Sequence, residues 1–302
     1  MRAILSPKSG PPDILRLAEV ERPTPKAAEI LVKVRYATVT MGDVNMRRLP
    51  RLLLAVLGAL FGFKPMKIPG VEYAGEVAEL GSGVAEYAAG DAVVGTTTGL
   101  AYGANAEYVR VPVKSRHGVL VRKPDALGFR EAAASVAGPM TALQILKRVE
   151  IKAGTRVLVY GASGSVGSSA VQLAKHFGAH VTGVCSTRNL ELVSSLGADA
   201  VIDYTAADFA ADGARYDVVF DAVGKIGRGM AKPVLATGGA FLSVKGPTKE
   251  RTEELELIQS LAASGELAVP IDREVSLAEV PEAHAYVESG RKRGNVVVAV
   301  AE

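Results

Sequence analysis

Cysteine is nearly absent from this chain of 302 residues, which contains only Cys185. A single cysteine excludes an intrachain disulfide bond. It also excludes a zinc centre built from three or four cysteines of one chain. Histidine is scarce as well, with four residues. Neither a disulfide framework nor a cysteine-rich zinc lobe can therefore stabilise one copy of the chain.

The sequence also lacks a strong charge of either sign and a long apolar run. Thirty-five basic and 32 acidic residues leave a net charge of +3, which singles out neither nucleic acid nor a membrane as a partner. The longest apolar stretch, 52–63, is too short to span a bilayer, and we interpret it as a buried packing element rather than a substrate-lining or lipid-contacting one. The first residues lack the apolar core of a signal peptide. We therefore expect no nucleic-acid partner, no membrane span and a cytoplasmic location.

Local patterns divide the chain into a β-rich part and an alternating part, so the fold class is α/β. Short strand-like stretches between glycines and prolines fill roughly the first 120 residues and predict an antiparallel, barrel-like domain. From about residue 125, apolar strands alternate with helices, which is typical of a parallel sheet covered on both faces. We place the alternating domain at 123–265 and the other at 1–122 and 266–302, since the length fits two domains of roughly 150 residues.

The individual elements can be placed by periodicity and by turn residues. The strands are expected at 30–36, 71–78, 91–95, 107–111, 156–160, 180–184, 200–203, 217–221, 240–244 and 296–300. The helices are expected at 129–149, with a break at Gly138-Pro139, and at 168–177, 190–196, 253–264 and 278–288.

A glycine-rich turn between a strand and a helix carries the strongest chemical signal. Gly161, Gly164 and Gly167 are spaced three apart after the strand 156–160. Glycines at this spacing permit a tight turn, close approach of a pyrophosphate and close packing of helix on strand. The pyrophosphate would lie at the helix N-terminus, where free N–H groups favour negative charge. We predict dinucleotide binding by Gly161, Ser163, Gly164, Ser165, Val166 and Gly167; the alternative is an ordinary β–α turn.

The end of the next strand indicates which dinucleotide is bound. An NAD site usually places Asp or Glu there to bind the ribose 2′-hydroxyl, but the run 184–189 contains no acid. Ser186 can donate a hydrogen bond, and Arg188 can pair with a 2′-phosphate. Cys185 ends the strand beside this pocket, and we interpret it as a small packed residue. The pattern favours NADPH, although the polar residues after Cys185 could also cap the next helix.

Several stretches together resemble the medium-chain dehydrogenase/reductase superfamily, within it the zinc-independent quinone oxidoreductase-like branch. The resemblance covers nearly the whole chain and rests on 36–43, 68–75, 90–93, 106–109, 138–142, 161–167, 196–199 and 202–204. It implies a GroES-like β-barrel catalytic domain joined to a Rossmann doubly wound parallel sheet. The short connection after the strand 241–244 indicates that this sheet is one strand short. Relatives often dimerise through that sheet edge, so the resemblance also implies a homodimer as a candidate assembly.

The resemblance also bears on metal binding. Zinc-dependent relatives hold zinc at positions that match Thr40, Val71 with Glu72, and Ala137 in this chain. Threonine, valine and alanine cannot supply the thiolate or imidazole that zinc prefers. We therefore expect no metal and interpret Glu72 as a structural residue.

The same resemblance implies a set of site residues. The catalytic candidates are Thr40, Asp43 and Thr141, and no proton donor stands out among Tyr36, Tyr73 and Tyr102. Val223, Gly224, Ser243 and Val244 follow the fourth and fifth strands and should face the nicotinamide. Tyr204 is expected on the adenosine side, and Asn295 lies where relatives have a cofactor-contacting residue.

The expected activity is hydride transfer from NADPH to a quinone or an α,β-unsaturated carbonyl. Without zinc as a Lewis acid, the acceptor must already be electron-poor, so we expect a small hydrophobic electrophile. Two alternatives stay open at this point. One is an enoyl-thioester reductase, and the other is a non-catalytic redox sensor that binds NADPH.

Overall fold

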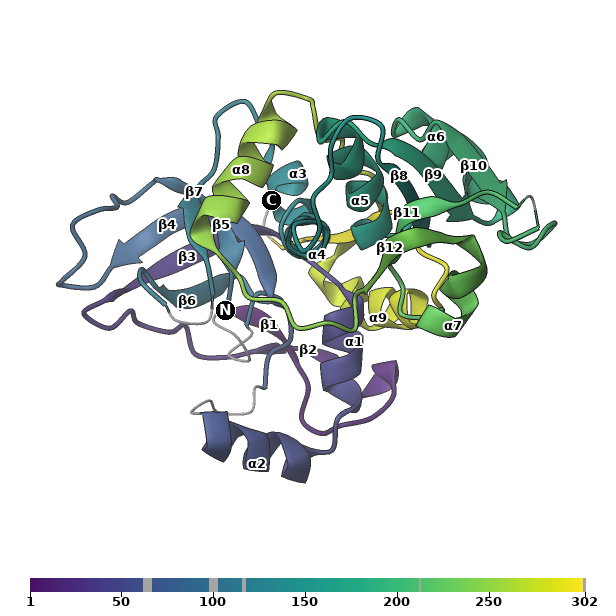
Figure 1. Ribbon diagram of the computed structural model, residues 1–302. Coiled ribbons are helices and arrows are strands. Elements are labelled where there is room, and N and C mark those ends of the chain that lie inside the picture. The colour runs from purple at the N-terminus through teal and green to yellow at the C-terminus, as the bar shows by residue number, and fades with distance from the viewer. Residues whose placement is uncertain (62–66, 98–102, 116–117, 212, 301–302) are drawn as a thin grey trace. The chain divides into compact units, whose positions relative to one another are not determined.

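The computed structural model describes residues 1–61, 67–97, 103–115, 118–211 and 213–300 (Figure 1). The chain forms two compact units. The first contains Met1–Val136, Glu250–Ser260 and Ile271–Glu302, and the second contains Ala137–Lys249 and Leu261–Pro270. The sequence-based limits of the two domains, 1–122 with 266–302 and 123–265, stay a prediction.

The first unit is built around a β-sheet with the strand order β13-β14-β3-β4-β5-β7, in which β6 also pairs with β3. Every pairing is antiparallel except that of β13 with β14. The strands are β3 (Glu29–Thr38), β4 (Glu72–Leu80), β5 (Ala92–Thr96), β6 (Tyr108–Pro112), β7 (Leu120–Arg122), β13 (Ile271–Ser276) and β14 (Asn295–Ala299). A separate antiparallel pair joins β1 (Arg2–Leu5) to β2 (Arg16–Glu19). The predicted antiparallel, barrel-like part is confirmed.

Alternation along β3 creates the core of this unit. Ile30, Val32 and Val34 lie two residues apart, so they project from one face of the strand into the same apolar cluster. Helix α9 (Val280–Glu288) adds Val280, Ala283 and Val287 to that cluster. Spacings of three and four residues place side chains on one side of a helix, which explains how α9 covers the sheet.

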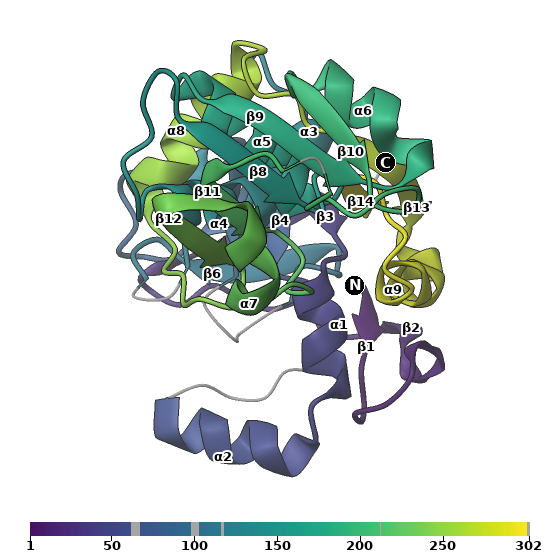
Figure 2. The same cartoon turned by 45° about the vertical axis from the view of Figure 1, so that its right-hand side comes forward.

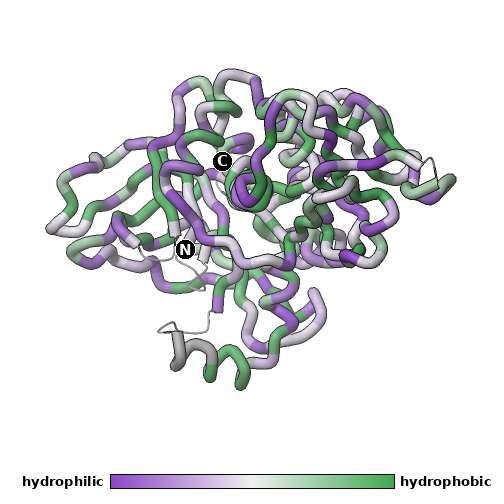
Figure 3. Tube along the Cα trace, viewed as in Figure 1, coloured by the Kyte–Doolittle hydropathy of each residue, from purple (hydrophilic) through white to green (hydrophobic). Residues whose placement is uncertain are grey.

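Helices α1 (Met41–Arg48) and α2 (Arg51–Phe61) interrupt the β-rich part. Helix α2 occupies most of the apolar run 52–63, and its residues are strongly hydrophobic (Figure 3). Leu54 is buried, but Leu52 is 79% exposed and Val56 is 49% exposed. The prediction of a buried element is therefore wrong for these two side chains, since among the described side chains of α2 only that of Leu54 is buried.

The second unit contains a five-stranded parallel sheet with the order β10-β9-β8-β11-β12 (Figure 2). Its strands are β8 (Arg156–Tyr160), β9 (His180–Cys185), β10 (Ala200–Asp203), β11 (Tyr216–Asp221) and β12 (Leu235–Ser243). The helices are α4 (Ala137–Leu146), α5 (Ser165–His176), α6 (Leu190–Ser195) and α7 (Arg228–Ala231). The strand order reverses between β8 and β11. Parallel sheets of this kind bind ligands at that reversal, beyond the carboxyl ends of the strands.

Two connections can be compared with the sequence-based expectation, and the first of them differs from it. Helix α3 (Phe129–Ala134) ends at Ser135, and α4 begins at Ala137. The break therefore precedes Gly138-Pro139, because proline is tolerated in the first turn of a helix, where its missing N–H would have no acceptor. At the other end, β12 forms one edge of the five-stranded sheet, and the chain then reaches α8 (Thr252–Ala263). This matches the expectation of a shortened sheet.

The described part of the chain contains no helix whose length and apolar character would suffice to cross a bilayer.

Candidate cofactor-binding site

The turn from β8 into α5 depends on two glycines for its shape. Gly161 has φ of +80°, and a Cβ there would lie 2.5 Å from Val223 Cγ1. A Cβ on Gly167 would lie 2.1 Å from the carbonyl oxygen of Gly161. The positive φ and the neighbouring Val223 side chain therefore require glycine at 161, and the close packing of α5 on the turn requires glycine at 167.

Gly164 differs from these two because it faces open space. It is the N-cap of α5, and a Cβ there would meet only the Gly161 carbonyl oxygen, at 3.7 Å. The first backbone N–H groups of α5, at Ser165, Val166 and Gly167, have no acceptor within the helix. An anion approaching over Gly164 would therefore meet free N–H groups and the positive end of the helix dipole.

Asn189 joins the glycine turn to the end of β9. Its side-chain Nδ2 donates to Ser163 Oγ at 2.9 Å and to Ser186 Oγ at 3.2 Å, and the residue is buried. Two of the predicted site residues are thereby brought together. Asn189 is not among the residues predicted from the sequence, where its only signal is its place in the polar run after Cys185.

Thr187 ties the same end of β9 to the neighbouring strand. Its hydroxyl contacts Asp203 Oδ2 at 2.5 Å and Thr205 Oγ1 at 2.9 Å. Hydrogen bonds from Thr187 and Thr205 lower the pKa of Asp203, which therefore stays a carboxylate. Arg188 is exposed between Thr187 and Asn189, both of which are anchored. The acid beside the end of β9 is thus Asp203 of β10, which already accepts hydrogen bonds from the hydroxyls of Thr187 and Thr205.

Cys185 ends β9, and Tyr204 directly follows β10, the strand that pairs with it. Burial, together with the charge of Asp203, raises the pKa of the Cys185 thiol to about 11, so the thiol is neutral and buried. The backbone N–H of Tyr204 donates to the Cys185 carbonyl at 3.1 Å. The half-exposed Tyr204 ring lies 6.2 Å from that of Tyr160, measured between centroids. These contacts place Tyr204 next to the end of β9.

A buried carboxylate gathers the turns that follow β11 and β12. Asp221 Oδ1 accepts from the backbone N–H groups of Val223 at 3.3 Å and Gly224 at 2.9 Å. Its Oδ2 accepts from Ser243 Oγ at 3.2 Å, and its carbonyl accepts from the N–H of Val244 at 3.1 Å. The sequence reading named the other four residues but not Asp221. The signal for it was an acid at the carboxyl end of a predicted strand.

Helix α4 brings Thr141 toward the start of α5. A Cβ on Gly138 would lie 2.0 Å from Ser165 Oγ, so the two helices approach closely at this point. Residues three apart share one face of a helix, and Thr141 therefore faces the same side as Gly138. Thr141 is half-buried there.

Thr40 and Asp43 bond to each other at the start of α1. The Asp43 N–H donates to Thr40 Oγ1 at 3.2 Å, and Asp43 Oδ2 accepts from the Thr40 N–H at 2.8 Å and from its hydroxyl at 2.6 Å. This is a capping box. Burial raises the pKa of Asp43. A helix-capping role accounts for these contacts, and the catalytic role of the pair stays a prediction.

Glu72 and Asn295 also belong to the first unit. Glu72 is buried and accepts a hydrogen bond from the Thr38 hydroxyl. Asn295 is buried at the start of β14, where it pairs with Ile271. Nearby, burial lowers the pKa of Lys292 to about 8, although Glu72 and Asp272 partly oppose this shift. Within the described residues, no three His, Cys, Asp or Glu side chains gather into a set that could hold a metal ion.

The tyrosine candidates for a proton donor have different surroundings. Tyr36 donates its hydroxyl to Glu274 Oε1 at 3.2 Å. Tyr73 is fully buried, and this burial raises its pKa. Tyr102 lies outside the described residues.

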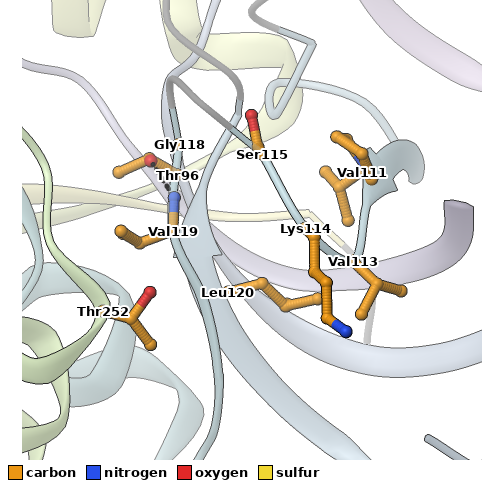
Figure 4. A pocket seen from close by; sticks show the side chains of 10 residues that line it. Thr96, Val111, Val113, Lys114, Ser115, Gly118, Val119, Leu120 and Thr252 are labelled. Carbon is orange, nitrogen blue, oxygen red and sulfur yellow. Dashed lines mark hydrogen bonds between the residues drawn. The ribbon is translucent and has the colours of Figure 1, made fainter. Parts of the chain in front are cut away.

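A cavity of about 270 Å³ opens in the first unit and is separate from all of these residues (Figure 4). Thr96, Lys114, Ser115 and Thr252 are among the residues that line it. None of the predicted site residues does so.

Residues 26–125 match the family model described as alcohol dehydrogenase GroES-like domain. Two models described as zinc-binding dehydrogenase match 165–268 and 247–298.

Two plant proteins and one bacterial structure are similar along most of the chain. The chloroplast envelope quinone oxidoreductase homolog of Arabidopsis thaliana is 32% identical, with 94% of this chain and 93% of that protein covered. The NADPH-dependent alkenal/one oxidoreductase, chloroplastic, of the same plant is also 32% identical, with coverage of 99% and 79%. The structure of the quinone oxidoreductase from Coxiella burnetii has a TM-score of 0.85 at 29% identity and covers 100% of this chain and 99% of that one.

The fold and these matches define the class: an oxidoreductase made of a GroES-like unit and a Rossmann-type unit. The chain belongs to the medium-chain dehydrogenase/reductase superfamily, in its quinone oxidoreductase-like branch.

Proposed function

We propose that this chain is an NADPH-dependent, zinc-independent reductase of quinones and α,β-unsaturated carbonyls. The observation that carries the proposal is the corner formed by the glycine turn and the end of β9. There Ser163 and Ser186 are held together by Asn189, and Arg188 is exposed beside them. The names of the two Arabidopsis relatives, a quinone oxidoreductase homolog and an alkenal/one oxidoreductase, point to the same substrate class.

The described residues fit the cofactor. The open face of Gly164 and the free N–H groups of α5 suit a pyrophosphate. Arg188 can form charge-assisted hydrogen bonds to a 2′-phosphate, and Asp203 is occupied by Thr187 and Thr205. An adenosine 2′-hydroxyl would therefore compete with existing bonds for the nearest carboxylate. This arrangement favours NADPH over NADH.

The residues of the chain bind and orient, while the cofactor supplies the redox chemistry. When bound, NADPH provides the hydride that adds to the electron-poor carbon of the substrate. Asp221 holds the turns at Val223 and Ser243 in place, so their backbones can position the nicotinamide end. We propose that Thr141 donates a hydrogen bond to the substrate oxygen, where negative charge develops. Thr40 stays a catalytic candidate, but its hydroxyl proton bonds to Asp43 and would have to leave that carboxylate to reach a substrate. Water or a side chain supplies the proton.

The absence of zinc ligands at the family's metal positions supports a metal-free reaction. Thr40, Val71 and Ala137 offer no thiolate or imidazole. Without a Lewis acid to stabilise an alkoxide, alcohol oxidation is disfavoured, and reduction of an acceptor that is already conjugated is the easier reaction. We propose that Glu72 is structural, in keeping with its hydrogen bond from Thr38.

A single assay series tests this function. NADPH and NADH oxidation would be followed at 340 nm with quinones, enones and enoyl thioesters, with and without a zinc chelator. We expect turnover of quinones or enones with NADPH and no effect of the chelator. Turnover of enoyl thioesters alone would support the thioester reductase instead. Tight NADPH binding without any turnover would support a redox sensor.

Assembly and location are further parts of this proposal. A homodimer and a cytoplasmic location stay predictions, which sedimentation velocity and cell fractionation can check. The relatives named above are described as chloroplast proteins, so fractionation should include organelles.

A further inference from the structure

Asn189 occupies a position in which its side chain would usually cap a helix. It is the N-cap residue of α6, yet its side chain makes no capping hydrogen bond. Instead, Nδ2 points back to Ser163 Oγ at 2.9 Å and Ser186 Oγ at 3.2 Å. Its Oδ1 is buried without a hydrogen-bond partner among the described residues. A buried acceptor without a partner costs free energy, so this orientation needs a reason other than capping.

The chemistry of the three groups supplies that reason. The amide nitrogen of asparagine can only donate, so both serine oxygens act as acceptors toward it. A hydroxyl that accepts one hydrogen bond still has its own proton to donate. Among the described hydrogen bonds, neither Ser163 nor Ser186 donates its proton to another group. Asn189 therefore leaves both protons available in directions away from itself.

The two hydroxyls lie where phosphates are expected. Ser163 belongs to the glycine turn that would hold the pyrophosphate, and Ser186 lies at the end of β9 beside Arg188. Asn189 is itself held by the bond from its N–H to the Ser186 carbonyl at 2.8 Å. Both serines are half-buried, so their hydroxyls can reach a ligand at the surface.

We propose that Asn189 is a positioning residue that turns the hydroxyl proton of Ser163 toward the pyrophosphate and that of Ser186 toward the 2′-phosphate of NADPH. Because only NADPH carries the 2′-phosphate, the Ser186 part of this effect strengthens the preference for NADPH over NADH. The proposal rests on the cofactor assignment made above. Asn189 acts only through the serines and contacts no reacting atom.

The test replaces Asn189 by an acceptor of the same shape. In N189D the carboxylate can only accept, so the serine protons would turn toward it and away from a phosphate. Dissociation constants for NADPH and NADH would be measured by the fluorescence of the bound cofactors. We expect the NADPH constant to rise about tenfold or more, as for loss of a hydrogen bond to a charged group, and the NADH constant to rise less.

A second background, in which both serines are replaced, separates reorientation of the serine protons from repulsion between the new carboxylate and the phosphates. The same substitution would be made in S163A/S186A, where no serine proton can be turned, and N189A would be compared in both backgrounds as a variant without the added charge. Melting temperatures would show that each variant is folded. The proposal expects both Asn189 substitutions to weaken NADPH binding in the parent chain and N189A to have almost no effect in S163A/S186A. The part of the N189D effect that persists in S163A/S186A measures repulsion alone.

The outcomes distinguish this proposal from the function on which it rests. Equal effects of N189D in both backgrounds would overturn it, because repulsion would then explain the whole loss. Unchanged NADPH binding in N189D would also overturn it. If the parent chain binds neither dinucleotide, both proposals fail. If the parent chain binds NADPH but reduces no substrate, only the enzymatic proposal fails, since the readout here is binding.

Discussion

The neighbours of the exposed residue Arg188 fix its backbone in place. Thr187 on one side bonds to Asp203, and Asn189 on the other bonds to two serines. The backbone of Arg188 is thus fixed from both sides while its side chain extends to the surface. Fixing a flexible cation in this way reduces the entropy lost when it pairs with a phosphate.

Substituting Arg188 should therefore change cofactor preference. We expect R188A to raise the dissociation constant for NADPH about tenfold or more and to leave that for NADH nearly unchanged, because only NADPH carries the 2′-phosphate. Calorimetric titration with both dinucleotides would measure this. R188K is the matched control and should give an intermediate value. Equal weakening of both dinucleotides would count against the assignment of Arg188.

The glycines of the turn should separate stability from binding. G167A places a Cβ 2.1 Å from the Gly161 carbonyl oxygen, so we expect it to lower the free energy of unfolding by about 1–3 kcal/mol. G164A enters open space and should leave stability nearly unchanged while obstructing a pyrophosphate. Thermal melts and NADPH titrations of both variants would check this. Normal NADPH binding by a folded G164A would contradict the assigned approach side.

His284 should make stability depend on pH. Burial and the nearby charge of Arg47 lower its pKa to about 3, against an ordinary value near 6.5. The unfolded chain therefore takes up this proton at a higher pH than the folded chain, so the contribution is fully present above pH 6.5 and is lost as the pH falls toward 3. Urea midpoints measured between pH 8 and 4 should fall for the parent chain. H284L should show a weaker decline, and an identical slope in both would exclude this origin.

At the scale of elements, α2 shows a helix formed by local preference with little burial. Its leucines and alanines favour a helix, and the residues just outside it are anchored. Ser9 donates its hydroxyl to the Leu49 carbonyl, and the Ser6 N–H donates to the Lys67 carbonyl at 2.6 Å. The chain is therefore bonded to one segment near the N-terminus both before α2, at Leu49, and after it, at Lys67. Among the large described side chains of α2, only Leu54 is buried.

Substitutions in α2 should follow burial rather than hydrophobicity. L54A should reduce the free energy of unfolding by about 2–3 kcal/mol, since it removes buried contacts. L52S should change it by less than about 0.5 kcal/mol, as is usual for exposed positions, although both residues are leucines. Urea denaturation of the two variants would compare them. A large loss in L52S would show that something covers this face in solution.

The Rossmann-type sheet illustrates the same distinction between local and distant information. Strands 156–160 and 200–203 are found at the predicted residues, because short apolar runs between glycine and polar turns define strands locally. β12 begins at Leu235, five residues before the predicted start, since pairing with β11 extends a strand whose own sequence contains two glycines. Pairing with a neighbour can override weak local preference.

At the scale of the whole molecule, the sequence predicts the two kinds of unit and their family, whereas site composition follows from contacts between distant residues. Ser163 and Asn189 are 26 residues apart, and Asp221 and Ser243 are 22 apart. Periodicity describes which face of an element is apolar but does not show which polar side chains meet when strands of a sheet align. Asn189 and Asp221 were therefore missed, although the helix that follows Asn189 and the strand that ends at Asp221 were anticipated.

What the sequence determined by itself is what depends on neighbouring residues: the strand–glycine–helix turn, the alternation of strands and helices, and the polar run after Cys185. Tertiary structure alone decided that Asp203 is occupied by two threonines, that Asp221 gathers two turns, and that most of the described apolar side chains of α2 are exposed. The physical reason is that turn chemistry and periodicity act over a few residues, whereas hydrogen-bond partners and burial are set by elements that meet only after folding.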